Sequence, residues 1–467
     1  MKTMIKRRLP LFLLLLAPFF AAAQTLQDTL HRIDALFEDV SQQTPGVSVT
    51  VSRHGTVIYD KHKGAANLEL GTPITDSTRF EAGSVSKQFT ATAVLLLVQD
   101  GKIGLDDDVR KYIPELPVYE KTITVRHLLN HTSGLKDWGV LAGLGGWPRG
   151  TREYTNELAL DYIVKQPTLN YTPGAEYLYS NSNYTLLTII AERVSGQPLA
   201  DFTRQRIFDP LGMDATLWRT DFREIVPHRA TAYNKAGTGY ETDMPFENTY
   251  GHAALLTTTA DLDKWNTSWK NSPLGGEALL RLRTTRGILN NGDTIAYAAG
   301  VMVDEYNGYP SVNHSGATAG YRAWLAYYPD QDLSIVYLAN DGSLSTTGTG
   351  SRIAALFLGT PPATETNRET NAVTSYDIDK DVLAAFAGRY VSKACDGELV
   401  ATLDGDTALL MTAPSNRRHR LKPIAKDRFS QGPQHAFRFE RNKQGEITGF
   451  YVSVPRARNV WFERVAE

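Results

Sequence analysis

Ser84-Val85-Ser86-Lys87 opens the stretch SVSKQFTATAVLLLVQDG, which occupies residues 84–101. Its apolar residues from Phe89 to Val98 cover most of the circumference of a helix, and Gly101 ends the pattern. A helix that is apolar on nearly every side packs inside a protein. The stretch therefore predicts a buried helix with Ser84 and Lys87 near its N-terminal end.

Ser84 and Lys87 are a candidate nucleophile and base. A serine hydroxyl is a weak nucleophile until a base removes its proton. Three residues apart on a helix, the two side chains share one face, and burial near positive charge lowers the pKa of a lysine. N–H groups at the start of the helix could also stabilise an oxyanion. Ser133 and Lys136 have the same spacing, but Gly134 indicates a loop there, and a simple N-cap role for Ser84 stays open.

Two further elements could supply groups to the same site. Tyr179-Ser180-Asn181 offers a phenol that could move protons and an amide that could hold a lysine and a substrate carbonyl. The same spacing occurs at residues 154–156, so spacing alone does not choose between them. His314-Ser315-Gly316 precedes a predicted strand pair, and its glycine would let a substrate backbone approach an N–H donor. A packed tyrosine and an ordinary turn are the alternatives.

Hairpins at both ends of the larger part of the chain predict a single antiparallel sheet. Strands are expected at 46–52 and 56–62, and again at 321–328 and 333–338. A helix is expected before them at 26–40, and helical patches joined by Gly- and Pro-containing loops fill residues 105–269. This order predicts an α/β (α+β) domain, with an antiparallel sheet flanked by helices and an additional helical region.

The C-terminal part predicts a second, smaller domain. Residues 361–375 are rich in Thr, Asn, Glu and Pro, which is typical of a linker. Short alternating segments then indicate strands at 388–392, 398–403, 408–412, 436–441, 447–454 and 460–464. We expect a small antiparallel β-barrel or sandwich. The predicted organisation is a signal peptide at 1–23, a catalytic domain at 24–360, a linker at 361–378 and the barrel domain at 379–467.

The N-terminus predicts export. A basic start, a short apolar run over residues 9–20 and the small residues Ala21 and Ala23 are typical of a signal peptide cleaved after Ala23. The run is too short to span a bilayer comfortably, so we expect no stable membrane anchor after cleavage. The predicted location is secreted or periplasmic, and an uncleaved anchor is the alternative.

Composition restricts the partners. The chain has 467 residues, 42% of them hydrophobic and 21% charged, which is typical of a globular protein, and its net charge of −2 gives no reason to expect nucleic acid. Small-molecule or peptide substrates are expected, and no cofactor or metal. Cys395 is the single cysteine and cannot form an internal disulfide.

Two other enzyme classes fit the sequence poorly. His127 and His131 are four residues apart, but Leu128 stands where the zincin pattern needs glutamate, and a third ligand is missing. A Ser-His-Asp hydrolase would carry Gly-x-Ser-x-Gly, which does not occur in the sequence.

The order and separation of the three elements resemble the serine β-lactamase and penicillin-binding DD-peptidase superfamily. The chain is most similar to its class C-like, peptidase S12-type branch of D-aminopeptidases and esterases. The resemblance covers residues 26–358 and includes the phrases TVRHLLNHTSGL at 124–135, PLGM at 210–213 and LTTTADL at 256–262. It selects Tyr179 over Tyr154, because the tyrosine of the family follows a Pro-Gly and is flanked by Ser-Asn. The C-terminal segment resembles the lipocalin-like barrel appended to some members.

The resemblance implies a role for each site residue. Ser84 would be acylated, while Lys87 and Tyr179 would manage protons. The N–H groups of Ser84 and Ala317 would form the oxyanion hole. Residues implied on the substrate side are Asn181, His314, Ser315, Gly316 and Ala317.

His314 narrows the implied activity. Class C β-lactamases begin the third motif with lysine, whereas a histidine resembles DD-peptidases, D-aminopeptidases and esterases. The resemblance therefore implies an acyl-enzyme that hydrolyses peptides containing D-amino acids, amides or esters. β-Lactam hydrolysis and acyl transfer to an amine, as in peptide cyclisation, are alternatives that use the same acyl-enzyme. An inactive peptidoglycan-binding sensor is the alternative from another class.

Overall fold

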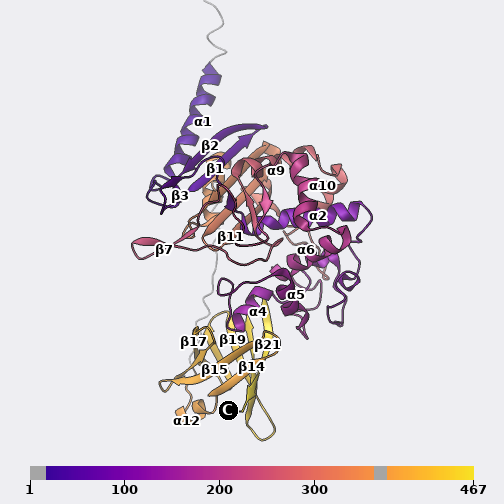
Figure 1. Ribbon diagram of the computed structural model, residues 1–467, viewed down its shortest axis with the longest axis vertical. Helices are drawn as coiled ribbons and strands as arrows, with labels where there is room; N and C mark the ends of the chain where they lie inside the picture. The colour runs from indigo at the N-terminus through magenta and orange to yellow at the C-terminus, as the bar shows by residue number, and fades with distance from the viewer. Residues whose placement is uncertain (1–16, 362–375, 467) are drawn as a thin grey trace, which may run out of the picture.

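The computed structural model describes residues 17–361 and 376–466 (Figure 1). A sheet with its surrounding helices forms the larger part, and a closed β-barrel lies below it in the view. Most of the predicted signal peptide and most of the predicted linker at 361–378 lie outside the described residues. The predicted domain boundaries stay predictions, while the α/β class with a C-terminal barrel is confirmed.

The central sheet is antiparallel and six-stranded. Its strands follow one another in space as β10 (Met302–Tyr306), β11 (Tyr309–Thr318), β12 (Tyr321–Tyr328), β13 (Leu333–Ala339), β1 (Val47–Arg53) and β2 (Thr56–Lys63). Both predicted hairpins are present, and β1 pairs with β13 from Val47↔Ala339 to Arg53↔Leu333. The two ends of the larger part thus meet in the middle of one sheet.

The alternation of β1 explains the two layers that cover the sheet. Val47, Val49 and Val51 point to one face of β1. They pack in a core with Ile33 of α1 and Ile353 of α11. The intervening polar residues face the opposite layer, where Ser52 Oγ donates a hydrogen bond of 2.7 Å to Asp263 of α9. Hydrogen-bonded polar groups therefore replace apolar packing on the α9 side of this strand.

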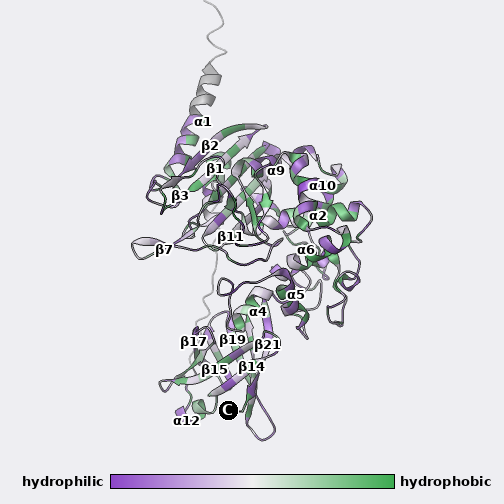
Figure 2. Ribbon diagram, in the orientation of Figure 1, coloured by the Kyte–Doolittle hydropathy of each residue, from purple (hydrophilic) through white to green (hydrophobic). Residues whose placement is uncertain are grey.

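Helices form the remaining layers. Their bounds are α1 (Ala17–Ala35), α2 (Lys87–Gln99), α3 (Val125–Leu129), α4 (Trp138–Leu144), α5 (Asn156–Val164), α6 (Asn181–Ser195), α7 (Leu199–Thr203), α8 (Asp209–Leu211), α9 (Thr259–Asn271), α10 (Gly276–Thr284), α11 (Thr346–Leu358) and α12 (Lys380–Ala384). Figure 2 shows hydrophobic residues along α2, and all its residues from Lys87 to Leu97 are buried. This confirms the buried helix expected from the sequence. The N-terminal helix ends at Ala35 rather than at residue 40.

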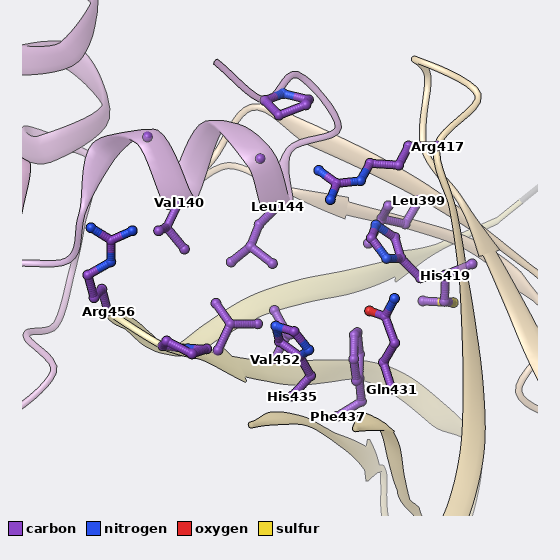
Figure 3. A pocket seen from close by; sticks show the side chains of 16 residues that line it. Val140, Leu144, Leu399, Arg417, His419, Gln431, His435, Phe437, Val452 and Arg456 are labelled. Carbon is purple, nitrogen blue, oxygen red and sulfur yellow. The ribbon is translucent and has the colours of Figure 1, made fainter. Parts of the chain in front are cut away.

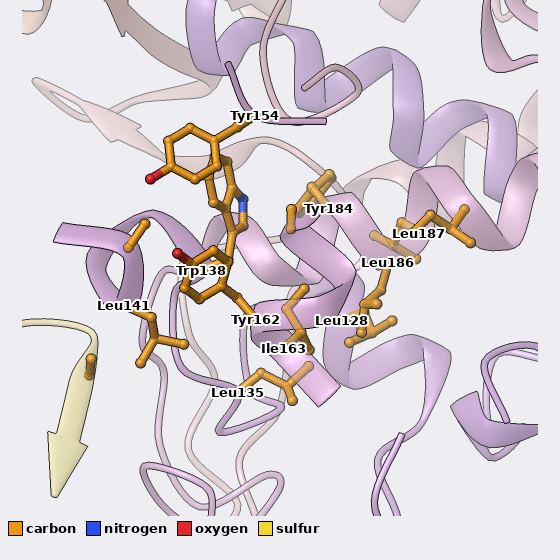
Figure 4. Packing of buried hydrophobic residues seen from close by; sticks show 14 of the residues in the cluster. Leu128, Leu135, Trp138, Leu141, Tyr154, Tyr162, Ile163, Tyr184, Leu186 and Leu187 are labelled. Atoms are coloured by element: carbon orange, nitrogen blue, oxygen red, sulfur yellow. The ribbon is translucent and has the colours of Figure 1, made fainter. Parts of the chain in front are cut away.

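The helical region has an aromatic core beside α6 (Figure 4). Trp138 of α4 packs against Tyr154 with 5.3 Å between ring centroids, and Tyr154 lies 6.3 Å from Tyr162 of α5. All three rings are fully buried. Large aromatic side chains contribute much of the burial energy of such a region, so α4 is held firmly against α5 and α6.

Short strands join these layers. They are β3 (Ala65–Asn67) with β4 (Thr72–Pro73), β5 (Phe80–Glu81) with β9 (Leu255–Thr257) and β6 (Leu217–Trp218), and β7 (Tyr233–Ala236) with β8 (Gly239–Thr242). β5 leads directly into the turn that carries Ser84, and the N–H of Ala82 donates to the carbonyl of Leu255 at 2.8 Å. This pairing anchors the approach to the candidate nucleophile.

The C-terminal part is a closed barrel and not a sandwich. In order around the barrel the strands are β14 (Gly388–Ser392), β15 (Gly397–Asp404), β16 (Ala408–Thr412), β17 (Arg418–Ala425), β18 (Arg428–Gly432), β19 (His435–Arg441), β20 (Ile447–Val454) and β21 (Ala457–Val465). Six of these were predicted. β17 and β18 were missed because β17 is rich in basic residues and contains Pro423, and β18 is short and ends in glycine, so neither has the apolar alternation of a strand.

None of the helices in residues 17–361 and 376–466 has both the length and the apolar character needed to cross a bilayer.

Candidate active site

Ser84 lies on a tight turn and not in the helix itself. The turn η1 (Gly83–Ser86) has 3₁₀ geometry and leads into α2, which begins at Lys87. Gly83 takes φ = +52°, a conformation that L-residues with side chains rarely adopt. A Cβ on Gly83 would also lie 2.7 Å from the backbone N of Ala317. The turn therefore brings Ser84 against β11, which no pattern within residues 84–101 could specify.

Lys87 connects Ser84 to two other elements. Its Nζ lies 3.1 Å from Ser84 Oγ, 2.9 Å from Asn181 Oδ1 and 2.8 Å from the carbonyl oxygen of His252. The lysine is fully buried. Burial holds the pKa of Lys87 well below its usual value, because an ammonium ion loses its hydration there. A neutral amine beside a serine hydroxyl can accept the hydroxyl proton.

Three charged residues modulate this lysine. Asp137 favours the charged ammonium and raises the pKa of Lys87, whereas Arg149 and Arg456 lower it, all three acting less strongly than burial. The Asp137 carboxylate is 1% exposed and accepts the N–H of Asn181 at 2.8 Å. Asp137 therefore holds the start of α6 in place, in addition to its effect on the charge of Lys87.

Tyr179 lies over Lys87 within a group of aromatic rings. Lys87 Nζ is 4.9 Å from the centroid of the Tyr179 ring, and the ring of His131 is 4.2 Å from that of Tyr179. Burial raises the pKa of Tyr179. The phenol thus stays protonated at neutral pH. Its buried hydroxyl has no hydrogen-bond partner among the described residues, so it remains available to a group that enters the site.

His131 supports this ring group rather than a metal site. Its Nδ1 accepts hydrogen bonds from the N–H of Ser180 at 3.2 Å and from Asn183 Nδ2 at 3.0 Å. Burial keeps the pKa of His131 well below its usual value, so the ring is neutral, with its proton on Nε2. α3 ends at Leu129, so His127 and His131 do not share a helix face. In the described ranges, no three His, Cys, Asp or Glu side chains are placed to hold a metal ion.

His314, Ser315 and Gly316 lie inside β11, whereas the sequence suggested a position before a strand. β10 pairs with β11 only as far as Met302↔Asn313, so no strand of the described ranges pairs with β11 on that side from His314 to Thr318. A Cβ on Gly316 would lie 2.0 Å from the carbonyl oxygen of Ala82. The free edge can pair with an extended substrate, and glycine is needed for β11 to pack against the turn that carries Ser84.

His314 is a neutral ring with a defined tautomer. Burial lowers its pKa to about 4, and Lys87 adds to the shift. Its Nδ1–H donates to the carbonyl oxygen of Ser315 at 2.6 Å, which leaves Nε2 to accept the hydroxyl of Tyr297 at 3.2 Å. At this position the site therefore has a neutral hydrogen-bonding group and no cation.

The alternative serine and tyrosine motifs lie in other surroundings. Ser133 Oγ donates to Asn183 Oδ1 at 2.6 Å, while Lys136 Nζ hydrogen-bonds to Thr168. The two side chains are thus engaged by different partners. Tyr154 is buried and donates to the backbone carbonyl of Trp147. The structure brings Ser84, Lys87, Tyr179 and Asn181 together and gives both alternative motifs structural contacts.

The barrel contributes a residue that sequence reasoning missed. Arg456, in the turn between β20 and β21, places a guanidinium nitrogen 3.4 Å from Asp137 Oδ2, and its carbonyl accepts the N–H of Asp137 at 3.0 Å. Arg458 in the same hairpin forms an ion pair of 2.9 Å with Glu176. Hundreds of residues separate the partners in these pairs, so no local pattern indicates them. The sequence patterns also did not indicate Asp137, Arg149 or His252 as residues of the site.

A cavity of about 430 Å³ borders Ala317. Arg149, Glu247 and Arg322 also line it, and Arg149 forms an ion pair with Glu247. Gly150 also lines it. Substrate groups next to the candidate oxyanion hole would have room here.

Comparisons with known proteins agree with this fold. The beta-lactamase family model matches residues 24–357, which is more than half of the chain. Penicillin-binding protein 4* of Bacillus subtilis (strain 168) is 27% identical over 434 residues, a match covering 86% of this chain and 92% of that protein.

Solved structures show the same architecture. The octameric penicillin-binding protein homologue from Pyrococcus abyssi aligns with a TM-score of 0.62 and 22% identity, covering 94% of this chain and 100% of the other. The D-amino acid amidase from Ochrobactrum anthropi SV3 aligns with a TM-score of 0.59 and 23% identity, covering 72% of this chain and 98% of its own. These matches confirm the resemblance inferred from the sequence motifs. The chain belongs to the beta-lactamase family of serine hydrolases.

Proposed function

We propose that this protein is an exported serine hydrolase that cleaves peptides containing D-amino acids, amides or esters through an acyl-enzyme on Ser84. The observation that carries the proposal is the contact of 3.1 Å between Ser84 Oγ and the buried Nζ of Lys87, whose pKa is lowered by burial. This pairing places a neutral base next to a hydroxyl nucleophile.

Acylation begins when Lys87 accepts the proton of Ser84. The serine oxygen attacks the carbonyl carbon, and the carbonyl oxygen becomes an oxyanion that the N–H groups of Ser84 and Ala317 stabilise. Asn181 has its Oδ1 on Lys87, so its Nδ2 is left to donate to the substrate. When the intermediate collapses, the bond from the carbonyl carbon to the leaving nitrogen or oxygen breaks.

Proton transfer to the leaving group involves Lys87 and Tyr179. The leaving atom takes the proton that Lys87 received, with the Tyr179 phenol as the relay, because its hydroxyl is buried and unpartnered within the described residues. Water then attacks the ester carbonyl in the reverse sequence, and Ser84 recovers its proton as the acid product leaves. Tyr179 acts as a neutral donor, since burial raises its pKa.

The substrate class follows from β11 and His314. An extended peptide can pair with the free edge after Asn313, and a neutral imidazole lies where β-lactamases of class C carry a lysine. The D-amino acid amidase among the similar structures is consistent with D-residue substrates. Cleavage after Ala23 and a secreted or periplasmic location remain part of this proposal, on the strength of the N-terminal sequence.

A substrate panel combined with covalent labelling tests the proposal. We expect turnover of p-nitrophenyl esters, D-amino acid amides or D-Ala-D-Ala peptides to exceed nitrocefin turnover. A fluorophosphonate should add one adduct on Ser84, visible by intact mass and peptide mapping. The Ser84→Ala variant should lose both signals, while Ser133→Ala, which alters the alternative Ser-x-x-Lys motif, should keep them. An adduct on Ser133, or nitrocefin as the fastest substrate, would overturn the assignment.

The pH dependence of catalysis should respond to the charges around Lys87. Activity requires the neutral amine, so kcat/KM rises as pH increases through the lowered pKa of Lys87. Asp137 raises this pKa, so Asp137→Asn should move the acidic limb of the profile to lower pH. Arg456 lowers it, so Arg456→Met should move the limb to higher pH.

The matched control for these two variants is Arg458→Met. Arg458 lies in the same hairpin as Arg456 but forms its ion pair with Glu176. We expect its profile to match that of the unmodified protein. If both Asp137→Asn and Arg456→Met moved the limb in the same direction, the electrostatic account of Lys87 would be wrong.

A further inference from the structure

A second cavity, of about 390 Å³, lies between α4 and the open end of the barrel (Figure 3). Val140 and Leu144 of α4 line it on one side. Met411, Phe437 and Val452 of three barrel strands line it on the other, and all three are buried. The volume falls within the range of small-molecule sites, about 300–1,000 Å³. Ser84, Lys87, Tyr179 and Asn181 do not line this cavity, although Arg456, which pairs with Asp137, does.

The cavity is the hollow mouth of an otherwise filled barrel. At the opposite end, Phe386, just beyond α12, packs its ring 4.9 Å from Phe429 and 4.9 Å from Phe439. Phe450 continues this stack at 5.1 Å from Phe439. Aromatic side chains therefore occupy the barrel interior as far as Phe437, which forms the cavity floor. A ligand would lie above this floor and beneath α4.

The polar part of the lining attracts an anion. Arg417, His419, Gln431 and His435 lie on one side of the cavity in Figure 3 and Arg456 on the other, and no Asp or Glu is among the described residues that line it. Arg417 is exposed and makes no side-chain hydrogen bond or ion pair within the described part of the chain. The Nδ1 of His419 is buried and likewise lacks a partner there. The buried nitrogen of His419 therefore needs a hydrogen-bonding partner, and the guanidinium of Arg417 close to it favours a partner that carries a negative charge.

We propose that this cavity binds an acidic amphiphile, a molecule with an apolar body and a single carboxylate. The apolar body lies on Met411, Phe437 and Val452 beneath α4, and the carboxylate pairs with Arg417. Planar guanidinium groups bind carboxylates with two parallel hydrogen bonds, which fixes the orientation of the ligand. The site is distinct from the proposed hydrolytic site, and its occupation does not depend on the chemistry of Ser84.

Calorimetric titration of the full chain with decanoate tests the site. We expect saturable binding with one ligand per chain, and binding about tenfold weaker for octanoate, because two buried methylenes are lost. Arg417→Gln should weaken decanoate binding by about tenfold or more, as expected when a charge-assisted bond is removed. Decylamine should bind more weakly than decanoate.

The matched control is Arg418→Gln. Arg418 is the first residue of β17, is exposed and does not line the cavity, although both neighbours, Arg417 and His419, do. Successive strand residues point to opposite faces. Arg418→Gln should therefore bind decanoate as tightly as the unmodified protein. The proposal is overturned if decanoate does not saturate, or if both glutamine variants have the same affinity.

The carboxylate can belong to a free acid or to the remote end of a substrate, and kinetics separate these sources. The mono-p-nitrophenyl ester of sebacic acid carries a remote carboxylate, whereas p-nitrophenyl acetate has none. If the carboxylate of a substrate binds at Arg417, Arg417→Gln would raise KM for the first ester and leave KM for the second unchanged. For a free acid, neither KM would change while decanoate binding weakens. The titration with decanoate does not depend on catalysis. If Ser84 proved inactive, the hydrolase proposal would be refuted, but the proposal of a carboxylate site in this cavity would not.

Discussion

Lys87→Met should lower kcat/KM for the best substrate of the panel by about a thousandfold or more. General-base catalysis contributes about 10²–10⁴-fold, and loss of the base also leaves the serine hydroxyl without a proton acceptor. Methionine has nearly the length of lysine and suits a buried position, but it gives no hydrogen bond to Asn181 Oδ1 or the His252 carbonyl. We expect the free energy of unfolding to fall by about 1–3 kcal/mol, because buried acceptors lose their donor. Steady-state kinetics measure the loss of kcat/KM, and chemical denaturation measures the loss of stability.

Lys136→Met is the matched control for this variant. Lys136 is also buried, its pKa is lowered by burial to about 8, and it belongs to the alternative Ser-x-x-Lys motif. Its amine is bonded to Thr168 and not to Ser133. We expect a similar loss of stability but activity within about threefold of the unmodified protein, since it contacts no reacting group. Equal losses of activity in the two variants would contradict the assignment of Lys87 as the base.

Gly316→Ala should be the second most damaging change. The new Cβ would lie 2.0 Å from the carbonyl oxygen of Ala82 and 3.2 Å from the N of Ser84, so β11 must move away from the turn. Displacement of the Ala317 N–H removes one oxyanion donor, a loss of about 10²–10³-fold in kcat. Crowding of this kind costs about 1–3 kcal/mol of stability. Steady-state kinetics and denaturation would measure both effects.

Gly239→Ala provides the comparison. Gly239 is also a strand residue, but a Cβ there would meet only the carbonyl oxygen of Ala236, at an ordinary 3.9 Å. We expect little change in stability or rate. Activity of Gly316→Ala within a few fold of the unmodified protein would mean that the Ala317 N–H is not an oxyanion donor.

Much of the fold could be predicted because it depends on local patterns. The apolar run of α2, the alternation of apolar and polar residues in β1 and the apolar run of β12 each extend over a few residues, and such patterns indicate helix or strand directly. Strands such as β17 were missed where charged side chains obscure the alternation. A barrel strand is stabilised by its neighbours on both sides, so its own sequence can be ambiguous.

The candidate site could be predicted in its residue types but not in its electrostatics. Sequence spacing offered two Ser-x-x-Lys pairs and two Tyr-x-Asn pairs. The buried helix after Ser84 favoured that serine, and family resemblance selected Tyr179. Only the tertiary structure brings Asp137, Arg149 and Arg456 near Lys87, the last from the barrel. The neutral state of His314 likewise follows from its burial rather than from its neighbours in sequence.

The sequence by itself determined most of the local elements and which residues are chemically able to act. The tertiary structure decided which of them meet, that Lys87 is buried beside Ser84, and that the barrel turn with Arg456 contacts Asp137. The physical reason is one of range. Periodicity and turn geometry act over neighbouring residues, whereas the loss of hydration and the Coulomb interactions that set a pKa depend on every group packed nearby, however distant in the chain.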